Sequence, residues 1–298
     1  MLKDYQAIIE KALAKGKRRF AVAGAHGKEV LEACIRAKNM GIMEPILIGP
    51  MKTIQSIASE AKLKLDSLRI ADVTVDKAMA EKASELVHLK EADAVMKGNI
   101  STPIVLKAVL DMRFGLRLGN LLSHIALMEI PTYHKLLLVT DSGMVIRPTL
   151  EQRQHILENA LCMIRKLGVD EPKVAILAAI EKPNPDMPET MDALKLVEMA
   201  ESGVFGKAIV EGPMALDMAF SAESAKIKNV ESKVAGDPDI LLVPDIASGN
   251  IFSKGLVYLA NAKISGIVVG AKMPIVLISR AEKAETWIRS IALANVVS

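Results

Sequence analysis

The sequence is poor in aromatic residues, which make up only 3% of its 298 positions. Its core must therefore be built from aliphatic side chains and from the 16 methionines. Proteins that hold single-stranded nucleic acids usually stack the bases on aromatic side chains, and this chain has few to offer. It also lacks an excess of one charge, because 38 basic residues stand against 35 acidic ones. These features argue against a nucleic-acid partner.

Cysteine is scarce, and neither Cys34 nor Cys162 lies in a CxxC or Cys/His spacing. Each lies in an apolar helical pattern, which predicts two small buried side chains. No stretch approaches the roughly 20 apolar residues of a membrane-spanning helix. Residues 1–19 have the pattern of an amphipathic helix rather than of a signal peptide. We therefore expect a cytoplasmic protein without a membrane partner.

The common nucleotide, metal and hydrolase motifs are also missing from the sequence. There is no GxxxxGK[ST], no GxSxG, no HExxH and no dinucleotide-binding GxGxxG. Clusters of carboxylates with metal-ligand spacing are not evident either. We expect no metal and no cofactor, and scattered Lys, Arg, Ser and Asn side chains suit a transfer between groups that are already activated.

The pattern that is present repeats a short apolar run, a loop rich in Gly, Pro or Asp, and a helical segment. Because several runs are apolar throughout, they are typical of strands buried on both faces of a mainly parallel sheet in an α/β protein. Strands are expected at residues 20–23, 45–48, 94–96, 136–139, 174–178, 207–210, 240–243, 267–269 and 275–278. Helices are expected at 28–40, 150–167 and 189–201, with Thr149 preceding the second as its N-cap, and Thr102 is expected to cap the helix that begins at Pro103.

Ligands of open α/β sheets bind at the carboxyl ends of the strands, so the loops that follow strands are the candidate sites. One strand delivers Lys97 into a loop that ends at Thr102, the expected N-cap of the next helix, and this arrangement favours an oxyanion. In the first such loop, Gly24 and Gly27 bracket His26. We interpret this loop as a structural turn, although a helix N-terminus also favours anions.

Further candidates are cations and polar residues in otherwise apolar segments. Arg113 and Arg117 would be costly in a packed region unless they meet acids or an anionic ligand. Ser123 is followed directly by His124, but adjacent residues of a strand face opposite sides, so this pair is not a catalytic dyad. Asp217 is an isolated acid in an apolar helix and needs a partner or a role.

Two segments near the C-terminus carry the most distinctive polar pairs. Asn250 and Lys254 are four residues apart on a helix that we expect to open at Gly249–Asn250, and they share one face of it. Ser279 and Arg280 follow a predicted strand directly and precede the last helix. A hydroxyl beside a guanidinium at this position suits a polarised nucleophile or leaving group.

Several segments together resemble the phosphate acetyl/butyryltransferase family, and its butyryltransferase branch more than its acetyl branch. The resemblance covers nearly the whole chain. The matching segments are VMKGNISTP, RLGNLLSH, LLVTDSGMVIRPTL, EGPMALDMAFS, AGDPDILLVPDIASGNIFSKGLVYLA and GIVVGAKMPIVLISRA.

The resemblance implies two α/β domains with mainly parallel sheets and an interdomain cleft, as in isocitrate and isopropylmalate dehydrogenases. The first domain would comprise residues 1–122 and 270–298, and the second residues 123–269. A homo-oligomer is also expected. The implied reaction is the reversible transfer of a short-chain acyl group, butyryl or branched by preference, between coenzyme A and phosphate through an acyl phosphate. Coenzyme A and phosphate are then substrates, and no cofactor is needed.

The resemblance also implies roles for the candidate residues. In the acetyl branch a Ser–Arg pair serves the CoA thiol and the acyl phosphate, and that pair matches Ser279 and Arg280, the expected catalytic residues. The expected substrate-binding residues are Lys97, Thr102, Arg117, Ser123, Asp217, Asn250 and Lys254. The acetyl branch places an Asp further along as the suggested base, but the matching stretch here has only Glu282 and Glu285.

Three other functions stay open at this point. A phosphate acetyltransferase differs only in the size of the acyl group. A metal- and NAD-dependent hydroxyacid dehydrogenase could use a related scaffold, although the sequence lacks a dinucleotide fingerprint. A non-catalytic acyl-CoA-binding protein is the alternative of another class, because a fold does not fix a function.

Overall fold

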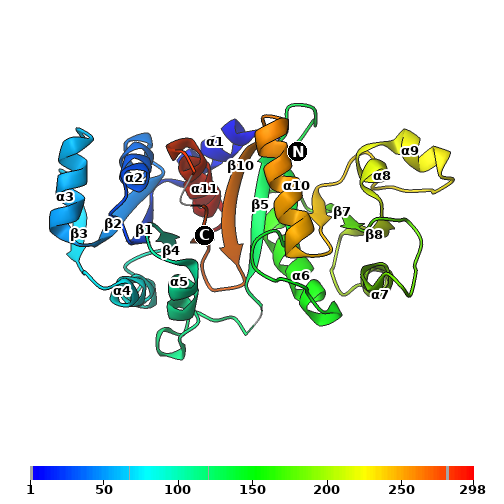
Figure 1. The fold of residues 1–298 in the computed structure, drawn as a ribbon, viewed down its shortest axis with the longest axis horizontal. Helices are drawn as coiled ribbons and strands as arrows, with labels where there is room; N and C mark the ends of the chain where they lie inside the picture. The colour runs from blue at the N-terminus through cyan, green and yellow to red at the C-terminus, as the bar shows by residue number, and fades with distance from the viewer. Residues whose placement is uncertain (1–2, 67, 120, 280–281) are drawn as a thin grey trace. The chain divides into compact units, whose positions relative to one another are not determined.

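The structure is a computed structural model that describes residues 3–66, 68–119, 121–279 and 282–298. It divides into two compact units. We call Tyr5–Asn120 together with Ser265–Ser298 the terminal unit, and Leu121–Ile264 together with Met1–Asp4 the central unit. Helices from the two ends of the chain thus belong to one unit. In Figure 1 the first helix, in blue, lies beside the last, in red, and the two are in contact.

The strands of the terminal unit lie in the order β3-β2-β1-β4-β11-β10. Neighbours are parallel except for β10 and β11, which form an antiparallel pair. The strands are β1 (Arg18–Ala23), β2 (Met43–Gly49), β3 (Arg69–Asp72), β4 (Ala94–Lys97), β10 (Lys263–Val269) and β11 (Ile275–Val276). Because β1, β4 and β11 are adjacent and parallel, the loops that follow them lie side by side at one edge of this sheet.

Helices cover both faces of this sheet. In Figure 1 α1, α2 and α11 lie on one face, and α4 and α5 lie on the other. The helices are α1 (Tyr5–Lys15), α2 (Lys28–Met40), α3 (Met51–Glu60), α4 (Asp76–His88), α5 (Thr102–Val109), α11 (Ala284–Val297) and a 3-10 turn at Met112–Phe114. Burial on both faces explains the continuous apolar runs, and all four residues of β4 are buried.

The strands of the central unit lie in the order β5-β6-β9-β7-β8, with β5 antiparallel to β6 and the other neighbours parallel. They are β5 (Ser123–Glu129), β6 (Leu137–Thr140), β7 (Lys173–Leu177), β8 (Ile209–Met214) and β9 (Ile240–Leu242). The helices are α6 (Leu150–Lys166), α7 (Pro188–Glu201), α8 (Leu216–Phe220), α9 (Ala222–Ile227) and α10 (Ile246–Leu259). In Figure 1 α6 and α7 lie on the side of the sheet opposite to α10.

Alternate strand residues of the central unit form an aliphatic core against α8 and α10. The strand residues that share this side include Ala126, Met128, Leu137, Val139, Ala175 and Leu241. Met218 of α8 belongs to the same cluster, and Phe252 and Leu256 of α10 pack against it. Aliphatic and methionine side chains therefore fill this core, as the scarcity of aromatic residues requires.

The mainly parallel α/β architecture predicted from the sequence is confirmed, and so are several helix boundaries. Helix α2 covers residues 28–40 as expected and ends at Gly41 with a φ of 86°. Helix α6 begins with the predicted N-cap Thr149, whose side chain accepts from the amide of Gln152 in a capping box. These boundaries were predictable because the capping residues act locally.

Two local expectations are wrong. The N-cap of α5 is Ser101, and Thr102 is the first helical residue. Cys162 is exposed rather than buried, whereas Cys34 is buried as expected. Cys162 lies four residues from both Glu158 and Lys166, on the face of α6 that is turned toward solvent. The apolar residues around it belong to the other face.

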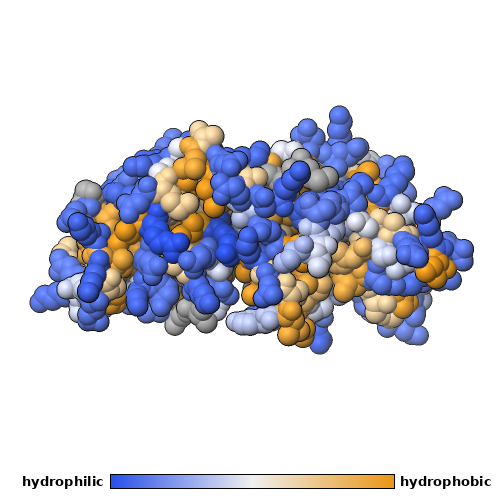
Figure 2. All heavy atoms as spheres, turned by 90° about the horizontal axis from the view of Figure 1, so that it is seen from above, coloured by the Kyte–Doolittle hydropathy of each residue, from blue (hydrophilic) through white to orange (hydrophobic). Residues whose placement is uncertain are grey.

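The face of the molecule in Figure 2 is mostly hydrophilic, and hydrophobic side chains form smaller groups between the polar ones. Such exposed apolar groups are normal for folded proteins. Of the helices that the structure describes, none has both the length and the apolar character required to span a membrane.

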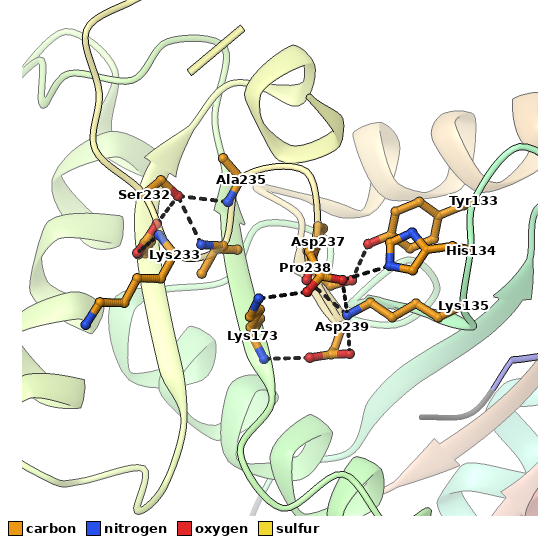
Figure 3. Close-up of polar contacts among 12 residues, drawn as sticks. Tyr133, His134, Lys135, Lys173, Ser232, Lys233, Ala235, Asp237, Pro238 and Asp239 are labelled. Atoms are coloured by element: carbon orange, nitrogen blue, oxygen red, sulfur yellow. Dashed lines mark hydrogen bonds and ion pairs between the residues drawn. The ribbon is translucent and has the colours of Figure 1, made fainter. Parts of the chain in front are cut away.

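A network of charges closes the amino edge of the central unit's sheet. Lys135 precedes β6, and its ammonium group lies 2.6 Å from the carboxylate of Asp239 and 2.8 Å from that of Asp237. Lys173 at the start of β7 contacts Asp237 at 2.7 Å, and its backbone amide donates to Asp239. Figure 3 shows both lysines converging on the two carboxylates. This network fixes the segment before β9 to the starts of β6 and β7.

Residues just before Lys135 also form hydrogen bonds with this network. His134 contacts Asp237 at 2.8 Å, and the Tyr133 hydroxyl donates to the carbonyl of Pro238. Burial by itself raises the pKa of Asp237, but the bonds from Lys135, Lys173 and His134 outweigh it and hold this pKa well below its ordinary value. A cavity of 310 Å³ adjoins these groups. Their charges compensate one another, which indicates a structural role.

The Lys135→Met substitution should lower the free energy of unfolding by about 3 kcal/mol, because it leaves the carboxylate of Asp239 without its main partner in a buried place. The lysine side chain is only 4% exposed. Lys195→Met is the matched control, since Lys195 forms an exposed pair with Glu198 and should matter by less than about 0.5 kcal/mol. Urea denaturation at pH 7 measures both. Equal effects of the two substitutions would contradict the structural role.

Candidate functional site

The loops after β1 and β4 are fastened to each other at the carboxyl edge of the terminal unit's sheet. The amide of Gly98 donates to the carbonyl of Ala23 at 2.8 Å, and that of Asn99 donates to the carbonyl of Gly24 at 2.7 Å. A Cβ atom on Gly98 would lie 2.2 Å from the oxygen of Gly24, so only glycine permits this approach. The two loops therefore form one rigid platform.

Two helix N-termini emerge from this platform. Helix α2 has Gly27 as its N-cap and α5 has Ser101, and neither residue makes a side-chain capping bond. The first backbone N–H groups of a helix have no partner within it and carry a partial positive charge. An anion that contacts both helix starts would satisfy these donors.

Lys97 places a positive charge at the same edge. Its side chain is almost fully buried, and its ammonium group donates to the carbonyls of Gly98 at 3.2 Å and Ile100 at 3.5 Å. Thr102 follows on the first turn of α5, where it is partly exposed. The structure thus brings the predicted residues Lys97 and Thr102 together beside a site that is suited to an anion.

Ser279 belongs to the same edge of the terminal unit. Strand β11 is parallel to β4, so the segment that follows β11 lies beside the loop after β4. Ser279 ends this segment and is exposed. Arg280, the other predicted catalytic residue, lies outside the described residues.

Arg117 is not grouped with these residues. Its backbone bridges to Ala271 in the turn before β11, at the opposite end of that strand from Ser279. Arg113 and Arg117 are both exposed, so neither guanidinium lies in a packed apolar region. The carboxylates of Asp111 and Glu81 pair with Arg113, at 2.8 Å and 2.7 Å.

In the central unit, Asn250 and Lys254 are both exposed on α10, which follows β9. The helix begins earlier than expected, at Ile246, because Asp245 and Ser248 form a capping box there. Gly249 is therefore a buried helical residue, and a Cβ on it would lie 2.7 Å from a methyl group of Val243. Close packing rather than a helix start explains this glycine.

The other two predicted residues of the central unit already have protein partners. Ser123 is fully buried, and its hydroxyl accepts a hydrogen bond from Asn159 at 3.0 Å. Asp217 is exposed and pairs with Lys228 at 3.0 Å, and this hydrogen bond lowers the pKa of the carboxyl. Lys228 is thus the partner that this acid requires.

Comparison with known proteins gives a consistent result along the whole chain. The model of a family described as phosphate acetyl/butaryl transferase matches residues 5–85 and 74–295. The chain belongs to this family. It is 42% identical to a phosphate acetyltransferase of Thermotoga maritima, with 98% of each chain covered. It is 40% identical to a phosphate butyryltransferase of Clostridium acetobutylicum, with 100% of this chain and 99% of the relative covered.

A solved structure agrees with this assignment. The crystal structure of a branched-chain phosphotransacylase from Enterococcus faecalis V583 superposes with a TM-score of 0.83 at 32% identity, covering 94% of this chain and 99% of the other. The resemblance noted in the sequence is confirmed, and the chain is an enzyme, a phosphate acyltransferase. Acetyl and butyryl relatives are about equally similar in sequence.

Glu285 lies in the stretch where the acetyl branch carries the suggested base, but its carboxylate is not free. This residue, on the first turn of α11, pairs with Arg36 at 2.9 Å. The hydrogen bond from Arg36 lowers the pKa of Glu285, which makes it a poorer proton acceptor. Within the described residues, no group of three or more His, Cys, Asp or Glu could hold a metal ion.

One polar cluster of this acyltransferase was missed in the sequence. Nδ1 of His124 lies 3.1 Å from the hydroxyl of Ser142, whereas in the sequence only Ser123 was considered as a partner of His124. The carboxylate of Asp141 accepts the amides of Gly143 and Met144, both at 2.9 Å. Burial lowers the pKa of His124, and the charge of Asp141 opposes this only in part. The TDSG sequence was a signal, but the pairing depends on the antiparallel register of β5 and β6.

Proposed function

We propose that this acyltransferase moves a short-chain acyl group reversibly between coenzyme A and inorganic phosphate, with butyryl or branched acyl groups preferred. The observation that carries the proposal is the common edge of β1, β4 and β11, where two uncapped helix N-termini, Lys97 and Ser279 occur together. Such a site suits a phosphoryl group. The acyl groups and coenzyme A, the second substrate, are inferred from the names of the relatives.

In the proposed reaction, a phosphate oxygen attacks the thioester carbonyl carbon, the C–S bond breaks, and coenzyme A leaves as a thiolate that then takes up a proton. The reverse reaction consumes the acyl phosphate and the thiol. Ser279 donates a hydrogen bond to the sulfur, and Arg280 clamps the phosphoryl oxygens. Lys97 and Thr102 hold the phosphate. Orientation of the two substrates and stabilisation of the developing charge supply the acceleration.

In the central unit we propose that Asn250 and Lys254 contact coenzyme A, since both are exposed on one face of α10. No metal and no cofactor enters this reaction. We also propose that the fold is similar to that of isocitrate and isopropylmalate dehydrogenases, and that the enzyme is cytoplasmic. Phosphate acetyltransferase activity is the nearest alternative, because a relative of that name is 42% identical.

We also propose a homo-oligomer that uses α10. One face of this helix exposes large apolar side chains, with Ile251 at 72%, Tyr258 at 76% and Leu259 at 87%. Gly255 lies between them with nothing within 4 Å of a Cβ placed on it, which leaves room for a second helix. Burying these side chains against a second copy would remove them from water.

The proposed function predicts that butyryl-CoA releases its thiol only when phosphate is present, with a rate that saturates as phosphate increases. EDTA and the absence of NAD should make no difference. A thiol-reactive dye measures the release. Release without phosphate would indicate a thioesterase, and binding of butyryl-CoA with no release under any condition would indicate an acyl-CoA-binding protein.

The Arg280→Ala substitution should lower kcat by about 100-fold, because one charged donor to the transition state is typically worth about 3 kcal/mol. Arg69→Ala is a matched control, since Arg69 is an exposed arginine at the start of β3 that pairs with Glu91. It should retain the kcat of the unmodified enzyme. Near-normal kinetics of the Arg280 variant would remove this residue from the mechanism.

For the acyl group, we expect butyryl-CoA to exceed acetyl-CoA by about fifteen-fold in kcat/KM. Butyryl buries two more methylene groups at about 0.8 kcal/mol each, if the transition state keeps these contacts. The comparison is made at saturating phosphate, with a branched acyl-CoA as a third substrate. Equal or better use of acetyl-CoA would identify a phosphate acetyltransferase instead.

A further inference from the structure

His26 lies at the proposed phosphate site, in the turn between β1 and α2 that the sequence indicated as structural. This turn is held against the loop after β4 by the backbone bonds of Gly98 and Asn99. The side-chain amide of Asn99 also approaches the carbonyl of His26, at 3.5 Å. The backbone of His26 is thus fixed relative to Lys97 and the start of α5.

The imidazole ring of His26 has one buried side. Its Nδ1 atom is buried and has no hydrogen-bond partner. A Cβ atom on Gly49 would lie 3.4 Å from Nδ1, so this side of the ring packs against the end of β2. The residue as a whole is partly exposed, and Nε2 is not among the buried unpaired atoms.

This asymmetry decides which nitrogen carries the proton of the neutral ring. A buried N–H group without an acceptor is strongly unfavourable. With the proton on Nε2, the buried Nδ1 keeps only a lone pair, and the N–H group is on the accessible nitrogen. The ring then presents a donor, and no residue that the structure describes accepts a hydrogen bond from it.

The groups around this donor favour an anionic acceptor. His26 immediately precedes Gly27, the N-cap of α2, so the first free amides of that helix follow it. Lys97 and the start of α5 lie on the adjoining loop. An N–H donor among these positive groups matches an oxygen of a phosphoryl group.

We propose that His26 is a phosphate-binding residue of this enzyme, and that Nε2–H donates to an oxygen of inorganic phosphate or of the acyl phosphate. The inference rests on the proposed function for the identity of the anion. It assigns a binding role to a residue of a turn that the sequence analysis interpreted as structural.

Two amide substitutions separate this role from ring packing. In His26→Gln the side-chain NH₂ group can reach the place of Nε2, whereas in His26→Asn it reaches only the place of Nδ1. Losing a hydrogen bond to a charged group typically costs tenfold or more in affinity. We therefore expect KM for phosphate to rise at least tenfold in the Asn variant. In the Gln variant KM for phosphate should be at least fivefold lower than in the Asn variant. KM for butyryl-CoA should change less than twofold in both.

The outcomes divide clearly. A selective rise in KM for phosphate, larger in the Asn variant, supports the proposal. Equal phosphate KM values in both variants and the unmodified enzyme would overturn it, and so would equal losses in both variants accompanied by a similar rise in KM for butyryl-CoA. Urea denaturation of both variants identifies a loss that comes from unfolding, and if the Asn variant is unfolded, His26→Ala, which also removes the Nε2–H donor, replaces it in the comparison with the Gln variant.

A binding measurement keeps this test separate from the proposed function. Calorimetric titration with inorganic phosphate alone, without any acyl-CoA, should show weaker binding to the Asn variant than to the Gln variant and the unmodified enzyme. If the unmodified enzyme binds phosphate but releases no thiol from acyl-CoA, the proposed function fails while the role of His26 stands. If phosphate binds all three proteins equally, the role of His26 fails while the transferase activity is untouched.

Discussion

The candidate site depends on one close approach between backbones, which only a glycine at position 98 allows. With any side chain there, a Cβ atom would lie 2.2 Å from the carbonyl oxygen of Gly24. The approach lets two amides of one loop bond to two carbonyls of the other. It thereby sets the spacing of the α2 and α5 N-termini and keeps Lys97 beside them. A site for an anion is then built mostly from backbone, with few charged side chains.

The two edges of the parallel sheets serve different purposes. At the carboxyl edge of the terminal unit, the N-termini of α2 and α5 lack side-chain caps, and the buried Nδ1 of His26 has no hydrogen-bond partner. At the amino edge of the central unit, Lys135, Lys173, Asp237 and Asp239 satisfy one another. Unsatisfied polar groups are costly in a folded protein, so an edge that retains them is the better candidate for a ligand.

Much of the fold could be predicted from the sequence because its signals are local. Apolar runs indicated the buried strands, and Thr149 as an N-cap marked the start of α6. The errors came where a residue's neighbours decide its role. Cys162 lies in an apolar segment but on the solvent face of its helix, and Gly249 was interpreted as a helix start although it packs against Val243. Neither can be seen without the tertiary contacts.

The candidate site was predictable in part for the same reason. Lys97 and Ser279 follow strands, so the sequence could indicate both, but it could not show that β11 lies next to β4. That adjacency, between residues far apart in the chain, is what brings them to one edge. The partners of Ser123 and Asp217, namely Asn159 and Lys228, were hidden likewise. His26 could be distinguished from a turn residue only once the burial of Nδ1 was known.

The most direct test of this account is hydrogen exchange, measured by mass spectrometry with and without inorganic phosphate. If phosphate binds the platform formed by the loops after β1 and β4, amide exchange should slow in residues 24–31 and 98–105. It should stay unchanged at the amino edge of the central unit, in residues 133–139 and 236–240. Protection at that amino edge, with none in the two loops, would contradict the account.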